Sequence, residues 1–210
     1  IVPRSSLQSN IRSLLALVSS MPLTLPYFYS PQLKQIIQRK LQEESFDLIF
    51  VYCSSMAQYV EDVHTIPRAI DFVDVDSEKW AQYAQRSSFP KNWVYRREST
   101  RLRKYEQQIA DTYQHCFLVS EREVEDFRKV VHPCPNLTAI LNGVEQEMFS
   151  PSSEPYDPNS LVFTGDMGYF ANVETVVWFC REVLPHIKQA VPDVTFTIVG
   201  RNPTEDVVQL

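Results

Sequence analysis

The chain has 210 residues, of which 44% are hydrophobic and 12% are aromatic. This composition excludes an intrinsically disordered protein, because it supplies enough apolar surface for a packed core. The formal net charge of −6 argues against nucleic acid as the main partner, since phosphate binding needs a net basic surface.

The first part of the chain predicts two helices separated by a proline-containing loop. Apolar residues at helical spacing indicate an amphipathic helix over residues 5–20, and these residues are Ile11, Leu14, Leu15 and Val18. Prolines then break the chain into a loop that carries the aromatic residues 27–29. A second amphipathic helix is predicted over residues 30–44.

Strands and helices alternate after residue 46, which is typical of a doubly wound parallel sheet. Residues 47–52 form a short apolar run, and we predict a strand that is buried on both faces. The remaining predicted strands span residues 68–73, 115–119 and 137–141. Helices are predicted over residues 54–62, after an Asp76 N-cap, over 92–113, and after a Ser120 N-cap to 130.

A second α/β domain is predicted after a Pro/Ser-rich stretch at residues 150–160. We predict an N-terminal domain over 1–152, a linker over 153–160 and a second domain over 161–210. The second domain would contain strands at 161–164 and 195–199 around a helix at 172–190, which Pro185 kinks or divides. Because two parallel strands and one helix cannot bury their apolar faces, we expect this domain to be incomplete at Leu210.

The cysteines and histidines are scattered, without C-x-x-C spacing or a histidine pair at helical spacing. We therefore predict no metal site built from these residues. The cysteines are typical of buried, reduced thiols, which favours a cytoplasmic protein. No apolar run reaches the about 18–20 residues that a membrane-crossing helix needs, so we also expect solubility.

Glycines follow three of the predicted strands. Gly165 and Gly200 end neighbouring strands of the second domain, where a glycine lets a phosphate or ribose approach backbone N–H groups. Asn142 and Gly143 follow the last strand of the first domain. A tight turn is the simpler interpretation of this pair, and a ligand at the carboxyl edge of the sheet is the functional one.

Asp74 and Asp76 form an Asp-x-Asp sequence at the end of a predicted strand. Carboxylate oxygens at such a position suit a divalent cation. Because Asp76 already has a role as an N-cap, we predict no metal site here. Both residues are instead predicted to line a cleft.

Five basic residues share the helix predicted over 92–113 with Glu98 and Glu106. They are Arg96, Arg97, Arg101, Arg103 and Lys104. A solvated helix face with ion pairs is the favoured interpretation. Peripheral contact with an anionic membrane is the alternative.

Taken in order, these features resemble the retaining, nucleotide-sugar-dependent glycosyltransferases of the GT-B fold, in the group called family 4. The segments that carry this resemblance cross the predicted domain junction and span residues 140–145, 148–151, 161–165, 172–179, 184–185 and 196–201. Residues 71–80, 95–98 and 105–106 look like the sugar transferases associated with exosortase/PEP-CTERM exopolysaccharide systems.

The resemblance implies transfer of a hexose from a nucleotide-diphosphate sugar to a glycan or lipid-linked acceptor at the cytoplasmic face of the membrane. It implies two Rossmann-like domains and no obligatory metal or other cofactor. The implied donor-binding residues are Gly165, Asn172, Gly200 and Arg201, and the implied cleft-lining residues are Asp74, Asp76, Asn142 and Gly143. No catalytic residue is assigned.

The family begins with a strand and a glycine-rich loop and ends with a paired-glutamate motif. The resemblance implies that these lie before Ile1 and after Leu210, so we expect the chain to be the middle of a longer enzyme. It departs from the family by having Cys53 where many relatives have histidine, and Asp166 where many have arginine. The alternatives are a nucleotide-sugar epimerase of the same fold and a non-catalytic module that binds a sugar or nucleotide.

Overall fold

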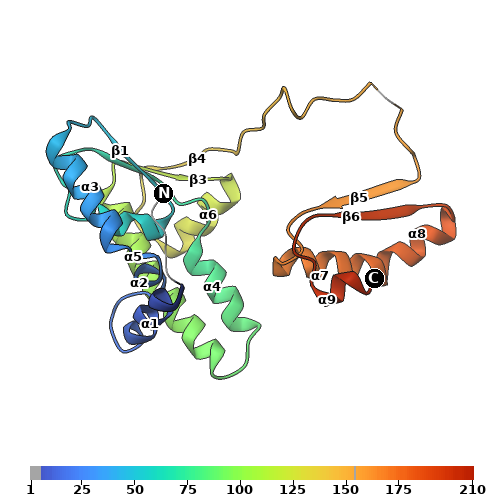
Figure 1. Ribbon diagram of the computed structural model, residues 1–210, viewed down its shortest axis with the longest axis horizontal. Helices are drawn as coiled ribbons and strands as arrows, with labels where there is room; N and C mark the ends of the chain where they lie inside the picture. The colour runs from blue at the N-terminus through green and yellow to red at the C-terminus, as the bar shows by residue number, and fades with distance from the viewer. Residues whose placement is uncertain (1–5, 154) are drawn as a thin grey trace. The chain divides into compact units, whose positions relative to one another are not determined.

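The computed structural model describes residues 6–153 and 155–210. The chain divides into two compact units, which we call unit 1 (Ile1–Val144) and unit 2 (Glu145–Leu210). Figure 1 colours them from blue to red along the chain. Residues 140–159 carry no helix or strand in their described part.

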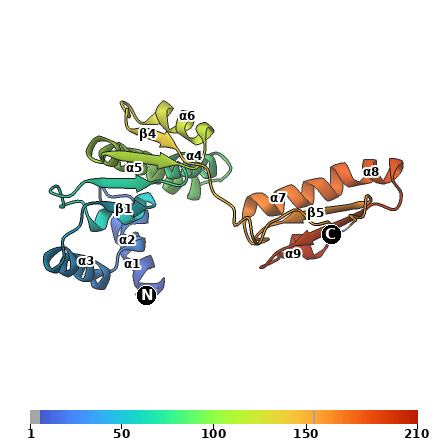
Figure 2. The same cartoon turned by 90° about the horizontal axis from the view of Figure 1, so that it is seen from above.

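Unit 1 is built on a four-stranded parallel sheet with the strand order β1-β2-β3-β4. The strands are β1 (Ile49–Tyr52), β2 (Arg68–Asp71), β3 (His115–Leu118) and β4 (Leu137–Ala139). Figure 2 shows α3 (Pro31–Glu43) at the β1 end of the sheet and α6 (Glu121–Val130) at the β4 end. The predicted parallel α/β architecture with flanking helices is confirmed.

The helices of unit 1 differ from the predicted ones in three places. The first helix ends at Ala16, four residues before the predicted end. Residues 54–59 form the short 3₁₀ helix η1 (Ser54–Tyr59) instead of a longer helix. The predicted aromatic loop contains the short helix α2 (Thr24–Phe28). The other helices are α1 (Ser6–Ala16), α4 (Asp76–Gln85) and α5 (Lys91–Thr112).

Central strands and α5 supply the core of unit 1. Ile70 of β2, Leu118 of β3 and Leu102 of α5 are fully buried, and Phe72 packs on Phe127 at 4.9 Å between ring centroids. This core holds β2 and β3 at the middle of the sheet. The carboxyl ends of all four strands therefore meet at one edge, because the strands are parallel.

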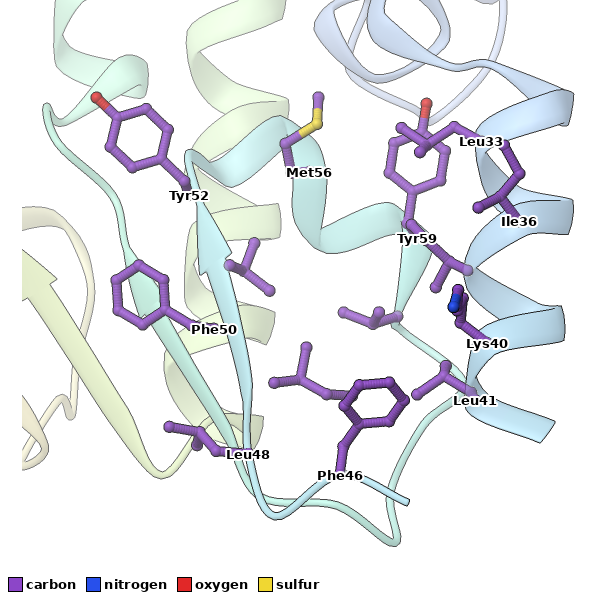
Figure 3. Close-up of a pocket in the computed structure, with 14 residues that line it drawn as sticks. Leu33, Ile36, Lys40, Leu41, Phe46, Leu48, Phe50, Tyr52, Met56 and Tyr59 are labelled. Carbon is purple, nitrogen blue, oxygen red and sulfur yellow. The ribbon is translucent and has the colours of Figure 1, made fainter. Parts of the chain in front are cut away.

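Strand β1 is not buried on both faces, and that prediction is wrong. Phe50 is 57% exposed and Tyr52 is also exposed, because β1 is an edge strand. Figure 3 shows both rings projecting from one side of β1, with Leu41 and Phe46 on the side towards α3. An apolar groove of about 510 Å³ lies between β1 and α3.

Unit 2 contains a two-stranded parallel sheet of β5 (Ser160–Thr164) and β6 (Thr195–Val199). The helical segments are α7 (Phe170–Trp178), the π-helical turn η2 (Phe179–Val183), α8 (Leu184–Ala190) and α9 (Glu205–Val208). The turn η2 ends two residues before Pro185 and interrupts the α-helical pattern near the place where a kink or division was predicted, because proline has no N–H for the helical ladder.

The core of unit 2 is small. Its buried apolar residues are Met167, Val176 and Val207, and partly buried residues such as Phe163 and Phe196 pack against them. Val162 and Val199 are exposed and lie on the uncovered face of the sheet. Among the helices of the described residues in either unit, none is long and apolar enough to cross a bilayer.

Candidate functional site

The carboxyl ends of β1 and β2 carry strained backbone. Cys53 has φ 70° and Val73 has φ 68°, in the left-handed region that a β-branched residue such as valine rarely adopts. Asp71 holds both turns, because its carboxylate accepts a hydrogen bond from the Val73 N–H at 2.9 Å and its carbonyl accepts one from the Cys53 N–H at 2.8 Å. Backbone strain of this kind concentrates at functional sites.

A buried serine orients Asp76 at the same edge. The Ser54 hydroxyl is almost inaccessible and donates to Asp76 Oδ2 at 2.9 Å. Burial is the main cause that raises the pKa of Asp76 above its ordinary value, while the Ser54 hydrogen bond opposes that rise. Asp74 is exposed, so the two predicted aspartates present one solvated and one half-buried carboxylate. We call Cys53, Ser54, Val73, Asp74 and Asp76 the β1–β2 edge.

Asp76 does not cap α4, and that prediction is wrong. It lies inside the helix, and the N-cap position is held by Val75, which has no capping side chain. The Ser77 N–H instead donates to Glu106 Oε1 at 3.0 Å. Glu106 comes from α5 and is buried, and this burial raises its pKa to about 7.

The Cys53 thiol is set up to stay protonated. Burial is the largest cause that raises the pKa of this thiol, and the carboxylates of Asp76, Asp71 and Asp74 raise it further. A thiol in acidic surroundings is a poor nucleophile at neutral pH, because the thiolate is the reactive form. In the part of the chain that the structure describes, no group of three His, Cys, Asp or Glu side chains is placed to hold a metal ion.

Asn142 and Gly143 lie on the same sheet edge but two strands from β2. Neighbouring strands are about 4.8 Å apart, so β4 is about 10 Å from β2. Both residues are exposed, no turn is assigned to them and Gly143 has no positive φ. The tight-turn interpretation is therefore wrong, and the structure does not bring this pair against Asp74 and Asp76.

In unit 2 the two glycines meet each other. Gly165 and Gly200 follow the paired residues Thr164 and Val199, and the Gly165 N–H donates to the Val199 carbonyl at 3.0 Å. A Cβ atom on Gly200 would lie 1.7 Å from the Gly165 oxygen, and one on Gly165 would lie 2.7 Å from Asn172 Nδ2. Packing inside the chain is thus enough to require a glycine at position 200, whereas a side chain at position 165 would first displace the Asn172 amide.

Asp166 organises the loop that follows Gly165. Its Oδ1 accepts from the Gly168 N–H at 2.9 Å and its Oδ2 accepts from Arg201 Nε at 2.9 Å. The backbone hydrogen bond from Gly168 is the main cause that lowers the pKa of Asp166, and Arg201 adds to it. Asn172 Nδ2 donates to the Asp166 carbonyl at 3.0 Å. The four predicted donor-side residues therefore gather around Asp166, and we call this set the β5–β6 edge.

The basic run on α5 is used inside the fold. Arg97 donates to the carbonyls of Leu17 at 2.9 Å and Ser19 at 2.8 Å. Arg101 also donates to the Ser19 carbonyl, and Arg103 pairs with Glu78 at 2.6 Å. Glu98 and Glu106 are buried, so the predicted solvated face of ion pairs is wrong for Arg97 and Arg101. Arg96 and Lys104 are exposed, and Arg103 forms a partly exposed ion pair, as that interpretation expects.

Several residues at these edges had no signal in the sequence. A positive φ is expected at glycine, but here it falls on Cys53 and Val73. Ser54 and Glu106 acquire their partners only through contacts between residues far apart in the chain. Cys53 and Asp166 could be singled out only as departures from the resembled family.

No protein-family model matches the chain, and no curated protein is significantly similar to it. The family resemblance therefore rests on the residues quoted above and stays a prediction.

Proposed function

We propose that the chain is part of a retaining glycosyltransferase with the GT-B fold, which transfers a hexose from a nucleotide-diphosphate sugar to a glycan or lipid-linked acceptor. The β5–β6 edge would bind the donor diphosphate. The β1–β2 edge would line the cleft, with Asp74 and Asp76 as hydrogen-bond acceptors for hydroxyl groups. This assignment follows the family resemblance and uses the geometry of each edge by itself.

The observation that carries the proposal is the state of Arg201. Its side chain is 82% exposed, and Asp166 holds it through Nε alone. Among the described residues, no acceptor engages its two terminal nitrogens. A guanidinium that is held at Nε presents a flat pair of donors, which suits two phosphate oxygens.

Many members of the resembled family have arginine at the position of Asp166. A carboxylate at this position would repel a diphosphate. The Arg201 pair answers this problem in part, because the two side chains neutralise each other. Backbone N–H groups at the start of α7 would add to the stabilisation of a leaving diphosphate. In this mechanism no metal ion is obligatory.

The test is calorimetric titration of the chain with GDP and UDP, with and without Mn²⁺. Replacing Arg201 by Ala should weaken nucleoside-diphosphate binding about tenfold, as expected for the loss of a charge-assisted contact. Arg181→Ala is the matched control, because Arg181 is an exposed arginine on η2 of the same unit. Equal affinities for the two variants would overturn the donor-site assignment.

Two further outcomes separate the alternatives. Binding that requires Mn²⁺ would revive a metal site at Asp74 and Asp76. Nucleotide binding without any turnover of nucleotide sugars, measured on the full-length protein, would favour the non-catalytic module.

A further inference from the structure

Helix α1 is amphipathic, but it packs with its polar side inwards. Ser9 and Ala16 are buried, the Ser13 hydroxyl donates to the Leu23 carbonyl at 3.1 Å, and Arg12 donates to the Tyr29 carbonyl at 2.8 Å. The apolar stripe of this segment faces solvent, and its members are Leu7, Ile11, Leu14, Leu15 and Val18. Such a stripe normally packs against the core. The stripe of this segment therefore lacks the apolar packing partner that its sequence favours.

The corner between α4 and α5 extends the same surface. Arg97 and Arg101 bind the carbonyls at the end of α1, so residues 16–19 lie against the second and third turns of α5. Trp93 precedes Arg97 by one helical turn, and both Trp93 and Phe89 are exposed. Figure 1 shows α1 and the α4–α5 connection at the same end of unit 1.

This end of the molecule is cationic in an acidic protein. Segments 6–29 and 86–97 contain no aspartate or glutamate, although the chain carries a net charge of −6. Their cations are Arg12, Arg86, Lys91, Arg96 and Arg97, of which Arg86, Lys91 and Arg96 are exposed. Arg97 is paired with the buried Glu98 at 3.7 Å and adds little to the surface charge. Exposed leucines and cations thus lie together in two segments that have no aspartate or glutamate. Such a surface suits a partner that is both apolar and negatively charged.

An apolar cavity lies behind this surface. It has a volume of about 330 Å³, and its lining includes Tyr27, Trp80, Val94 and the buried carboxylate of Glu98, which is held by the Leu23 and Thr24 N–H groups. It opens between the segment that holds α1 and α2 and the pair α4 and α5. Apolar space therefore accompanies the apolar surface at this end.

We propose that this surface docks the protein onto the headgroup region of an anionic phospholipid bilayer. We call it the α1 surface and define it by the α1 stripe, Phe89, Trp93, Lys91 and Arg96. The leucines would enter the acyl boundary, Trp93 would lie at the headgroup level, and the cations would meet lipid phosphates. The proposal is independent of transferase activity.

The experiment is co-sedimentation of the full chain with vesicles of phosphatidylcholine alone and of phosphatidylcholine with 30% phosphatidylglycerol. We expect binding to the anionic vesicles that falls as salt screens the cationic part. A blue shift of tryptophan emission that is absent in Trp93→Phe would report insertion of Trp93, as distinct from Trp80 and Trp178.

The deciding variant is Leu14→Ser combined with Leu15→Ser. Both residues are exposed, so the fold should persist, which far-UV circular dichroism checks, and vesicle affinity should fall at least about tenfold, given the apolar area lost. Val144→Ser with Met148→Ser is the matched control, because these residues are equally exposed outside the α1 surface.

Three outcomes would overturn the proposal. The first is the absence of binding to anionic vesicles. The second is binding that the double α1 variant leaves unchanged. The third is a dimer in solution that the α1 variant dissociates, because the surface would then be an interface between two copies of the chain.

Discussion

Unit 1 and unit 2 fix their polar groups by different physical means. In unit 1, buried carboxylates from α5 accept hydrogen bonds from backbone N–H groups of distant helices, and a large apolar core surrounds them. In unit 2, the loop is set by two glycines in contact and by one exposed ion pair, over a core of three buried residues. The comparison suggests that changes in unit 1 act mainly on stability, whereas changes at the β5–β6 edge act on ligand binding unless they separate the strands.

The largest effect is expected at Gly200, where unit 2 has least room. Gly200→Ala places Cβ 1.7 Å from the Gly165 oxygen, so β5 and β6 must separate, at a cost of about 4 kcal/mol or more. Hydrogen exchange of the β5 and β6 amides measures this loss. Gly143→Ala is the control, since nothing lies within 4 Å of its added Cβ. Equal protection in the two variants would show that the contact between the glycines does not hold unit 2 together.

The next effect concerns Glu98, which joins α2 to α5 in unit 1. Glu98 is 1% exposed, and its carboxylate accepts from the N–H groups of Leu23 at 2.6 Å and Thr24 at 2.8 Å. Glu98→Ala leaves those partly buried donors unpaired, so we expect the free energy of unfolding, measured in urea, to fall by about 3 kcal/mol. Glu125→Ala, at an exposed position, should stay within about 0.5 kcal/mol of the parent. A loss at Glu98 no larger than at Glu125 would contradict the role of buried carboxylates in unit 1.

A third test uses pH to separate the two units. Burial raises the pKa of Glu106 from 4.5 to about 7, so the folded state binds this proton more tightly than the unfolded state does. Its contribution to the free energy of unfolding is fully present below pH 4.5. About 3 kcal/mol of this contribution is lost as pH rises to about 7. Glu106→Gln should flatten this decline and keep an acceptor for the Ser77 N–H. Urea unfolding followed across this range measures it, and an unchanged pH profile would contradict the prediction.

For unit 2, Asp166 should give stability a pH dependence of the opposite sign. Its pKa is lowered by the Gly168 N–H and by Arg201, so its contribution is present above the ordinary value of 3.8 and is lost as pH falls through the folded pKa. Amide exchange in the 165–168 loop should therefore accelerate in acid, while the amides of α4 in unit 1 become better protected. Amide protection that changes in the same direction in both units would contradict this prediction.

The smallest effect is expected for ligand affinity in Asp166→Asn. The change takes the Asp166–Arg201 pair from neutral to one positive charge, so nucleoside-diphosphate affinity should rise by about two- to fivefold at low salt. Calorimetry at two salt concentrations checks this increase and its screening. A decrease in affinity would show that the Asp166 contact, which positions Arg201, outweighs the charge of Asp166.

Local sequence patterns predicted the class of fold well and the burial of its elements less well. The apolar run at 47–52 and the alternation after it are properties of neighbouring residues, so they indicated parallel strands and helices correctly. Whether β1 is covered depends on its place in the strand order, which neighbouring residues do not encode. Phe50 and Tyr52 are therefore exposed despite an apolar sequence. The stripe of α1 is a similar case, because its spacing predicts a helix but not the side that packs.

By itself, the sequence determined the α/β class, most of the helix and strand positions, the interruption of the helix before Pro185, and the placing of Gly165 and Gly200 after two neighbouring strands. Only the tertiary structure decided that Asp166 pairs with Arg201, that Glu106 replaces Asp76 at the start of α4, and that Asn142 lies away from Asp74. The physical reason is the range of the interactions. Periodicity and turn preference act between close neighbours in the chain, whereas burial, pKa and charge pairing depend on residues that only the fold brings together.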